Sequence, residues 1–182
     1  MTDWNFMTAI IVVGLFALWK LEFVATLLNL KHFPSTVPDE LSGLMDEEKL
    51  ERAHSYQTTT SKFDIVNSVV SITVLLAFWF LGGFGKLDVL SRSVFQNEIA
   101  AGLLYLSALF LGQSLVSLPF SVYRTFVIEN RFGFNRSTPR VFIMDQLKGL
   151  LLAALLGLPL GAAVLWIFGN VQHAWLWAWI VV

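Results

Sequence analysis

Histidine is the side chain best suited to bind a metal ion or to transfer a proton near neutral pH, and the chain has three, His32, His54 and His173. No two of them have the spacing of zinc ligands, no H-E-x-x-H motif occurs, and there is no cysteine to supply a thiolate. The sequence also lacks a glycine-rich phosphate loop and a G-x-S-x-G nucleophile turn. From the residues alone we predict no catalytic residue and no metal ligand in this chain.

Polar side chains at helical spacing inside long apolar segments are the second group of functional candidates. Polar groups are costly in hydrocarbon, so they usually face protein or water. The stripes consist of Glu22, Thr26 and Asn29, of Asp64, Asn67, Ser68 and Ser71, and of Gln113, Ser117 and Ser121.

Two interpretations of these stripes are open. The stripes either line a wetted cavity between helices that opens to the cytosol, or they form hydrogen bonds that hold the helices together in the bilayer. Glu22 and Asn67 strengthen the case for a cavity, whereas the serines and threonines alone favour hydrogen bonding. The candidates for lining such a chamber are Glu22, Asn29, Asn67, Gln113 and Ser117.

The composition excludes a soluble domain. Hydrophobic residues make up 56% of the 182 residues and charged residues only 14%, whereas soluble domains carry about 25% charged residues. A soluble protein of this length could not bury so much apolar surface, because its core is limited by its surface-to-volume ratio. The net charge of −1 gives no basic field for nucleic acid. We therefore predict an integral membrane protein whose main partner is the lipid bilayer.

Long apolar segments define the predicted spans, since a helix needs about 20 mostly apolar residues to cross a bilayer. The predicted spans cover approximately residues 6–30, 65–84, 99–122 and 147–168. A fifth apolar run, 175–182, is too short to cross, so the chain looks truncated within a fifth span. We expect an all-α, multi-pass transmembrane helical bundle with four complete spans plus the start of a fifth.

Polar segments separate the spans and predict their orientation. The two long ones, 31–64 and 124–145, carry most of the lysines and arginines, so the positive-inside rule places both in the cytosol and the N-terminus outside. Within the first, Asp46 is a plausible N-cap of an aqueous helix that leads into the second span. Glycines at 82–85 predict a turn, and 86–98 is expected to be a short loop.

Several polar segments resemble one known family. The matching segments are residues 37–41, 52–56, 61–63, 118–139 and 145–149. The most specific stretch is E-N-R-F-G-F-N-R-S-T, from Glu129 to Thr138. Together they are similar to the N-terminal membrane region of the type-1 CAAX prenyl protease family, and the match runs from the first span to Val182.

The resemblance implies a membrane zinc metallopeptidase with about seven spans around a water-filled chamber. It implies a cytosolic catalytic domain after the fifth span, where an H-E-x-x-H motif and a later glutamate bind zinc. This chain stops before those residues, so no catalytic residue transfers to it, and we expect it to be inactive alone. What transfers is a membrane anchor and chamber wall for peptide or membrane-protein substrates, in a protein whose expected location is the bacterial inner membrane.

The resemblance also places the most specific stretch beside the C-terminal peptidase domain of the same protein. The candidates for docking that domain are Glu129, Asn130, Arg131, Phe132, Gly133, Phe134 and Asn135. Without the resemblance, the same stretch is an ordinary basic cytosolic loop that sets topology.

Two further function classes are weighed against the protease module. The first is a standalone, non-enzymatic membrane scaffold or partner-binding protein. The second is a small transporter, which would also carry polar residues in its spans, but the sequence shows no inverted repeat.

Overall fold

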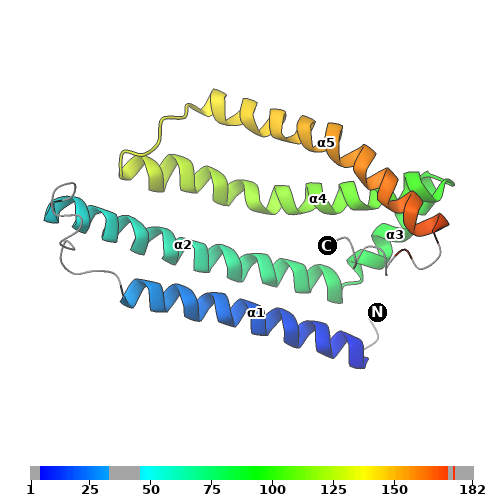
Figure 1. Ribbon diagram of the computed structural model, residues 1–182, viewed down its shortest axis with the longest axis horizontal. Helices are drawn as coiled ribbons and strands as arrows, with labels where there is room; N and C mark the ends of the chain where they lie inside the picture. Colours follow the sequence, from blue (N-terminus) through cyan, green and yellow to red (C-terminus); the bar gives the residue numbers. More distant parts are fainter. Residues whose placement is uncertain (1–4, 33–45, 172–173, 175–182) are drawn as a thin grey trace. The chain divides into compact units, whose positions relative to one another are not determined.

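The structure is a computed structural model that describes residues 5–32, 46–171 and 174. These residues form helices and no strand (Figure 1). The elements are α1 (Phe6–Lys31), α2 (Glu47–Phe80), α3 (Gly83–Val94), α4 (Glu98–Tyr123), the π-helical segment η2 (Arg124–Glu129) and α5 (Pro139–Asn170). The prediction of an all-α fold is confirmed.

Four helical segments are long and apolar enough to cross a membrane: α1, α2, α4 continued by η2, and α5. Their apolar side chains face outward; on α5, for example, Leu156 is 68% exposed and Leu160 is 67% exposed. Such surfaces are stable only in contact with lipid, because water would penalise every exposed methylene group. The chain is therefore a multi-pass integral membrane protein with four complete spans, as predicted. The predicted fifth run, 175–182, and His173 lie outside the described residues.

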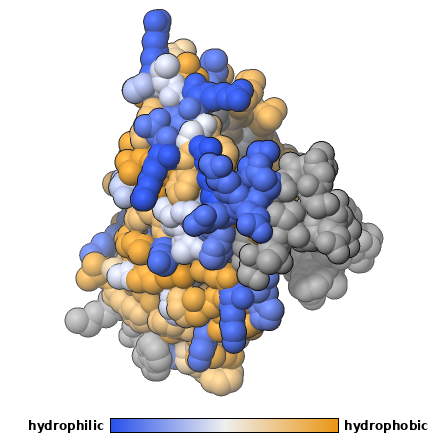
Figure 2. All heavy atoms as spheres, turned by 90° about the vertical axis from the view of Figure 1, so that its left-hand side faces the viewer, coloured by the Kyte–Doolittle hydropathy of each residue, from blue (hydrophilic) through white to orange (hydrophobic). Residues whose placement is uncertain are grey.

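Helix α2 extends well beyond the predicted second span. Its 34 residues correspond to about 51 Å at the helical rise of 1.5 Å per residue, whereas the hydrocarbon core of a bilayer is about 30 Å thick. The charged N-terminal part of α2 therefore projects out of the bilayer. Figure 2 looks onto the end of the molecule at which α2 begins, and hydrophilic side chains gather there among hydrophobic ones.

Asp46 caps the N-terminus of α2, as predicted. Its side chain accepts a hydrogen bond from the backbone N–H of Lys49 at 2.8 Å. This bond holds the pKa of the Asp46 carboxyl below its usual value. The capping contribution is therefore fully present above the ordinary carboxyl pKa and is lost only as the pH falls through the lowered value.

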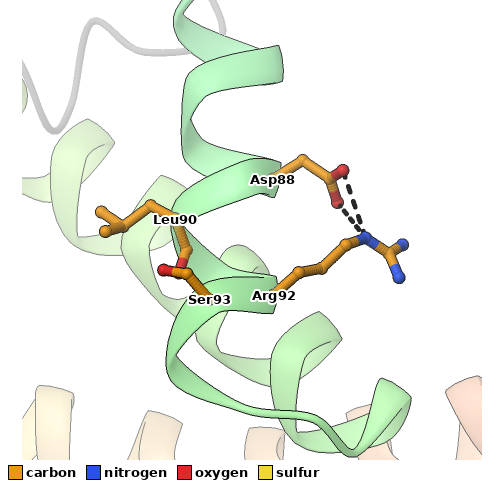
Figure 3. Close-up of polar contacts among 4 residues, drawn as sticks. All are labelled: Asp88, Leu90, Arg92 and Ser93. Carbon is orange, nitrogen blue, oxygen red and sulfur yellow. Dashed lines mark hydrogen bonds and ion pairs between the residues drawn. The ribbon is translucent and has the colours of Figure 1, made fainter.

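The connection after α2 differs from the sequence prediction. Instead of a turn over four glycine-rich residues, α2 ends at Phe80 and a single residue, Gly82 at φ +73°, redirects the chain before α3 begins at Gly83. The predicted loop at 86–98 is wrong, because α3 continues to Val94. Two features support that helix, apolar residues spaced by three or four and an ion pair between Asp88 and Arg92 (Figure 3).

The segment predicted as a polar loop at 124–145 is helical apart from residues 132–138. At the N-terminal side of this segment, helix α4, which contains Pro119, passes into the six-residue π-helix η2. Proline lacks the backbone N–H needed at that position, and π segments are rare and often mark functional sites. On its C-terminal side, Thr138 caps α5 and Pro139 occupies the first turn, which is the usual place for proline in a helix.

The chain divides into two compact units. The first comprises Met1–Gly82 and Val116–Arg136, and the second comprises Gly83–Leu115 and Ser137–Val182. In the first unit, α1 and α2 run side by side in opposite directions (Figure 1), and the Trp19 indole donates to the Ser68 hydroxyl at 3.1 Å.

In the second unit, α5 packs closely on the first part of α4. A Cβ atom built on Gly102 would lie 2.8 Å from Leu165 Cδ1, and one on Gly161 would lie 3.1 Å from Leu103 Cδ2. Glycine at both positions therefore lets the two helices approach, which is how helices commonly associate in membranes.

Candidate functional site

The best-defined cluster of polar and aromatic side chains lies where the projecting half of α2 meets the segment that contains η2. Both belong to the first unit. We call this cluster the α2–η2 interface. It consists of Arg52, Tyr56, Phe63 and Asp64 from α2 and of Phe120, Tyr123, Arg124, Phe132 and Phe134 from the later segment.

The outer end of the interface holds the most specific sequence stretch against α2. The Tyr56 ring meets the rings of Phe132 and Phe134 edge to face, with centroids 5.2 Å and 4.9 Å apart. Phe132 is buried, and the Arg52 guanidinium donates a hydrogen bond to its carbonyl oxygen. Edge-to-face ring pairs and hydrogen bonds from a charged donor are both favourable, so they hold α2 and the later segment together at this end of the interface.

A tight turn presents these two phenylalanines to α2. Gly133 has φ +76°, a conformation that glycine adopts without strain. Its N–H donates to the Asn130 carbonyl at 3.1 Å. The N–H groups of Phe134 and Asn135 both donate to the Glu129 carbonyl, at 2.8 Å and 3.2 Å. The stretch is therefore a helix C-terminal turn with a left-handed residue, and its shape depends on Gly133.

The inner end of the interface is aromatic and ionic. Phe63 stacks on Tyr123 with centroids 5.2 Å apart and lies 5.8 Å from the Phe120 ring. One residue further along α2, the Asp64 carboxylate accepts from the Arg124 guanidinium at 3.2 Å. Both charged side chains remain more than 40% exposed, so the ion pair contributes modestly to stability and mainly fixes the register of the two helices.

Two buried oxygen atoms of α2 lack a hydrogen-bond partner in the part of the chain that the structure describes, Thr60 Oγ1 and Asn67 Oδ1. They lie four residues before and three residues after Asp64, so all three side chains share one face of α2. A buried acceptor without a partner is costly unless water satisfies it. This face is therefore suited to hold ordered water.

The docking candidates divide into two groups in the structure. Phe132, Gly133 and Phe134 are used within the chain, because they close the turn onto α2. Asn130 and Arg131 are exposed, with the Arg131 guanidinium 5.9 Å from the centre of the Phe132 ring. The Glu129 and Asn135 backbones form the turn. Docking of a further domain on this stretch stays a prediction.

The chamber candidates are placed as follows. Glu22 and Asn29 are exposed on α1, and Asn67 is half-buried on the polar face of α2. Ser117 is half-buried in the same unit, whereas Gln113 is exposed in the other unit. Thr26 belongs to the same stripe as Glu22. Its hydroxyl donates a hydrogen bond to the Glu22 backbone carbonyl and is therefore satisfied within α1. The lining role of these residues stays a prediction.

Sequence reasoning did not select Arg52, Tyr56 or Arg124 as site residues. The spacing of Arg52, Tyr56 and Phe63 at i, i+4 and i+11 could have indicated one shared helix face. It could not have indicated the partner, because that partner lies 60 to 80 residues away in the chain. No group of three or more histidine, aspartate and glutamate side chains that could hold a metal ion occurs among the described residues.

Comparison with known proteins identifies the family. Residues 26–182 match the family described as CAAX prenyl protease N-terminal, five membrane helices. The chain belongs to this family. It is 37% identical over 142 residues to a CAAX prenyl protease 1 homolog of Oryza sativa subsp. japonica, covering 74% of this chain and 33% of the relative. It is 36% identical over 157 residues to the homolog of Arabidopsis thaliana, covering 81% of this chain and 37% of the relative.

A solved structure supports the same assignment. The fold matches the crystal structure of S. mikatae Ste24p with a TM-score of 0.83 and 27% sequence identity. The match covers all of this chain but 44% of the other. The chain spans about a third of the length of the Oryza and Arabidopsis relatives. It corresponds to the N-terminal membrane domain of these CAAX prenyl protease homologs.

Removing the Arg52 guanidinium tests the outer end of the interface. We expect Arg52→Met to release the turn at Phe132, because a hydrogen bond from a charged donor is lost, at a cost of about 2 kcal/mol. The measurement is the rate at which trypsin cuts after Arg131 in detergent. The matched control is Glu51→Gln, one residue away and exposed, which should be cut at the parent rate. Equal rates for Arg52→Met and the parent would contradict the role given to Arg52.

Proposed function

We propose that this chain is the membrane anchor and substrate-chamber wall of a zinc metalloendopeptidase. The observation that carries the proposal is the family match over residues 26–182 in a chain that spans about a third of its relatives' length. In this role the domain acts by positioning: it holds the peptidase domain at the bilayer and encloses the route of a peptide or membrane-protein substrate.

We assign no zinc ion to the described part of this chain. Its histidines and carboxylates do not gather into a set of ligands, whereas a catalytic zinc ion needs three protein ligands and one open position. We therefore assign the zinc ion, and the residue that activates water, to the peptidase domain of the full-length enzyme. The bilayer and that domain are the two partners we assign to this chain.

The α2–η2 interface is the part of the chain that we assign to docking. It is held together by aromatic contacts and a hydrogen bond, it stands on the projecting half of α2, and it leaves Asn130 and Arg131 exposed for contacts with a following domain. The alternative is a standalone membrane scaffold that uses the same surface for another protein.

The reading frame beyond Val182 separates these two proposals. We expect it to continue into a segment with an H-E-x-x-H motif, because the longer relatives extend well past the matched region. Sequencing the transcript that encodes this chain is the measurement. A stop codon directly after Val182 would reject the peptidase module and favour the scaffold.

The polar face of α2 supports a wetted chamber. Thr60 and Asn67 bury oxygen atoms without protein partners in the described residues, and Asp64 lies between them. A single helix face with this chemistry favours water over packing. Glu22, Asn29, Gln113 and Ser117 stay our sequence-based candidates for lining a chamber, a role that the next experiment tests for Glu22.

The substitution Glu22→Leu in the full-length enzyme tests the chamber. We expect it to lower the cleavage rate several-fold while leaving thermal stability nearly unchanged, because Glu22 is exposed and holds no described packing partner in place. The matched control is the neighbouring Leu21→Ala, also on the exposed surface of α1, which should preserve cleavage. Parallel loss of cleavage and of stability would instead make Glu22 a structural residue.

We further propose that the N-terminus lies outside and that 31–64 and 124–145 face the cytosol, following the distribution of lysine and arginine. The relatives from Oryza, Arabidopsis and S. mikatae are eukaryotic proteins, so they lend no support to the bacterial inner membrane. An intracellular eukaryotic membrane is compatible with the same orientation.

Cysteine labelling in sealed vesicles tests this orientation, because the chain has no cysteine of its own. A membrane-impermeant maleimide should label Glu48→Cys and Arg136→Cys from one side, and Arg92→Cys from the other. All three should react once the vesicles are opened with detergent. Labelling of Glu48→Cys and Arg136→Cys from opposite sides would overturn the topology.

A further inference from the structure

Helix α3 has two chemically different sides. On one, the Arg92 guanidinium donates to the Asp88 carboxylate at 3.0 Å, and both side chains are about half exposed or more. On the other lie Leu90 and Val94, each 58% exposed, with the exposed Lys86 one turn before Leu90. Val89, which is 69% exposed, lies between these two sides and nearer to Arg92. Figure 3 shows Leu90 leaving the helix on the side away from the Asp88–Arg92 pair. Residues two apart on a helix point about 160° away from each other, so this separation follows from the spacing.

A third side of α3 faces the protein. Ser91 is only 1% exposed, and its neighbours one and two turns earlier on the same face, Leu87 and Phe84, are half-buried. Ser91 therefore lies roughly between the charged pair and the exposed Leu90 and Val94 when the helix is viewed end on. The helix rests on the protein along one line and presents the Asp88–Arg92 pair on one flank and Leu90 and Val94 on the other.

The chain fixes the level of α3 relative to the bilayer. Only Leu81 and Gly82 separate it from the end of spanning helix α2, and only residues 95–97 separate it from the start of spanning helix α4. Two or three extended residues span roughly 7–10 Å. The 12 residues of α3 therefore cannot leave the surface of the membrane, and they are too few to cross it.

We propose that α3 is an interfacial helix that inserts Leu90 and Val94 among the lipids and keeps Asp88 and Arg92 in water. Its partner is the membrane surface itself. An amphipathic helix binds that surface by burying its apolar side at the boundary between headgroups and acyl chains. Because Asp88 neutralises Arg92 and only Lys86 remains unbalanced, the apolar flank carries the binding, and a zwitterionic bilayer suffices.

This assignment gives α3 a role beyond connecting two spans. A helix held in the interface fixes the depth at which α2 ends and α4 begins. The inference depends on the chain being a membrane protein and is independent of the peptidase activity proposed above.

Site-specific fluorescence quenching tests the proposal on the 182-residue chain in phosphatidylcholine liposomes. Single cysteines at Leu90→Cys and Val94→Cys carry an environment-sensitive fluorophore, without background labelling. The controls are Arg92→Cys and Gly85→Cys; Gly85 is exposed and has no neighbouring atom within 4 Å of an added Cβ. Circular dichroism and gel filtration of each variant establish that it is folded before reconstitution.

We expect nitroxide groups on the lipid chains to quench the Leu90→Cys and Val94→Cys labels several-fold more than the control labels. Iodide in the water should show the reverse order. Equal iodide quenching at all four positions would overturn the proposal. So would protection of the Leu90→Cys and Val94→Cys labels from both quenchers, since that result means protein covers this flank. If the two labels entered the bilayer only in the presence of anionic lipid, the claim that the apolar side chains carry the binding would be refuted.

Discussion

The absence of water around the spanning helices is the constraint on which the rest of this structure depends. In hydrocarbon every backbone N–H and C=O must find its partner inside the protein, and a continuous helix is the simplest way to achieve this. The four long helices and their outward-facing leucines, valines and phenylalanines follow from that constraint. The fold therefore has almost no conventional core; among the described residues few side chains are buried, and the apolar ones are Leu50, Ala101, Ile128, Phe132 and Ala174.

Because lipid replaces a core, specificity comes from a few polar and aromatic contacts. The α2–η2 interface illustrates this. The hydrogen bond from Arg52, the edge-to-face rings around Tyr56 and the ion pair between Asp64 and Arg124 set the register of two segments that hydrophobic burial alone would leave free to slide. The departures from regular helix at Pro119 and in η2 lie in the same region, where neighbouring polar groups can compensate for disturbed backbone bonding.

In the proposed function, this module would contribute to catalysis by positioning. Positioning a reactive centre and its substrate lowers a barrier because it replaces random encounter by a fixed geometry. The projecting half of α2 carries the turn at Gly133, held there by the contacts of Tyr56 and Arg52. The interfacial position proposed for α3 would add a fixed point at the other membrane surface.

The sequence by itself determined that lipid surrounds the helices, and it determined the fold class, the spans and the family. Composition, the length of the apolar runs and the stretch from Glu129 to Thr138 are local properties, and each can be read without knowing where the chain goes next. Local chemistry also determined the Asp46 cap. The local sequence did not predict helix α3. Its 12 residues have a mixed pattern that gives a weak periodic signal, and charged residues in a short segment between spans are also typical of a loop.

Only the tertiary structure decided which side chains act together. Arg52 meets Phe132 and Asp64 meets Arg124 across 80 and 60 residues of chain, and no spacing rule reaches that far. It also decided that the phenylalanines of the most specific stretch point back to α2, whereas Asn130 and Arg131 remain outside. The physical reason is that a helix fixes which residues share a face, but only the packing of two helices decides what that face meets.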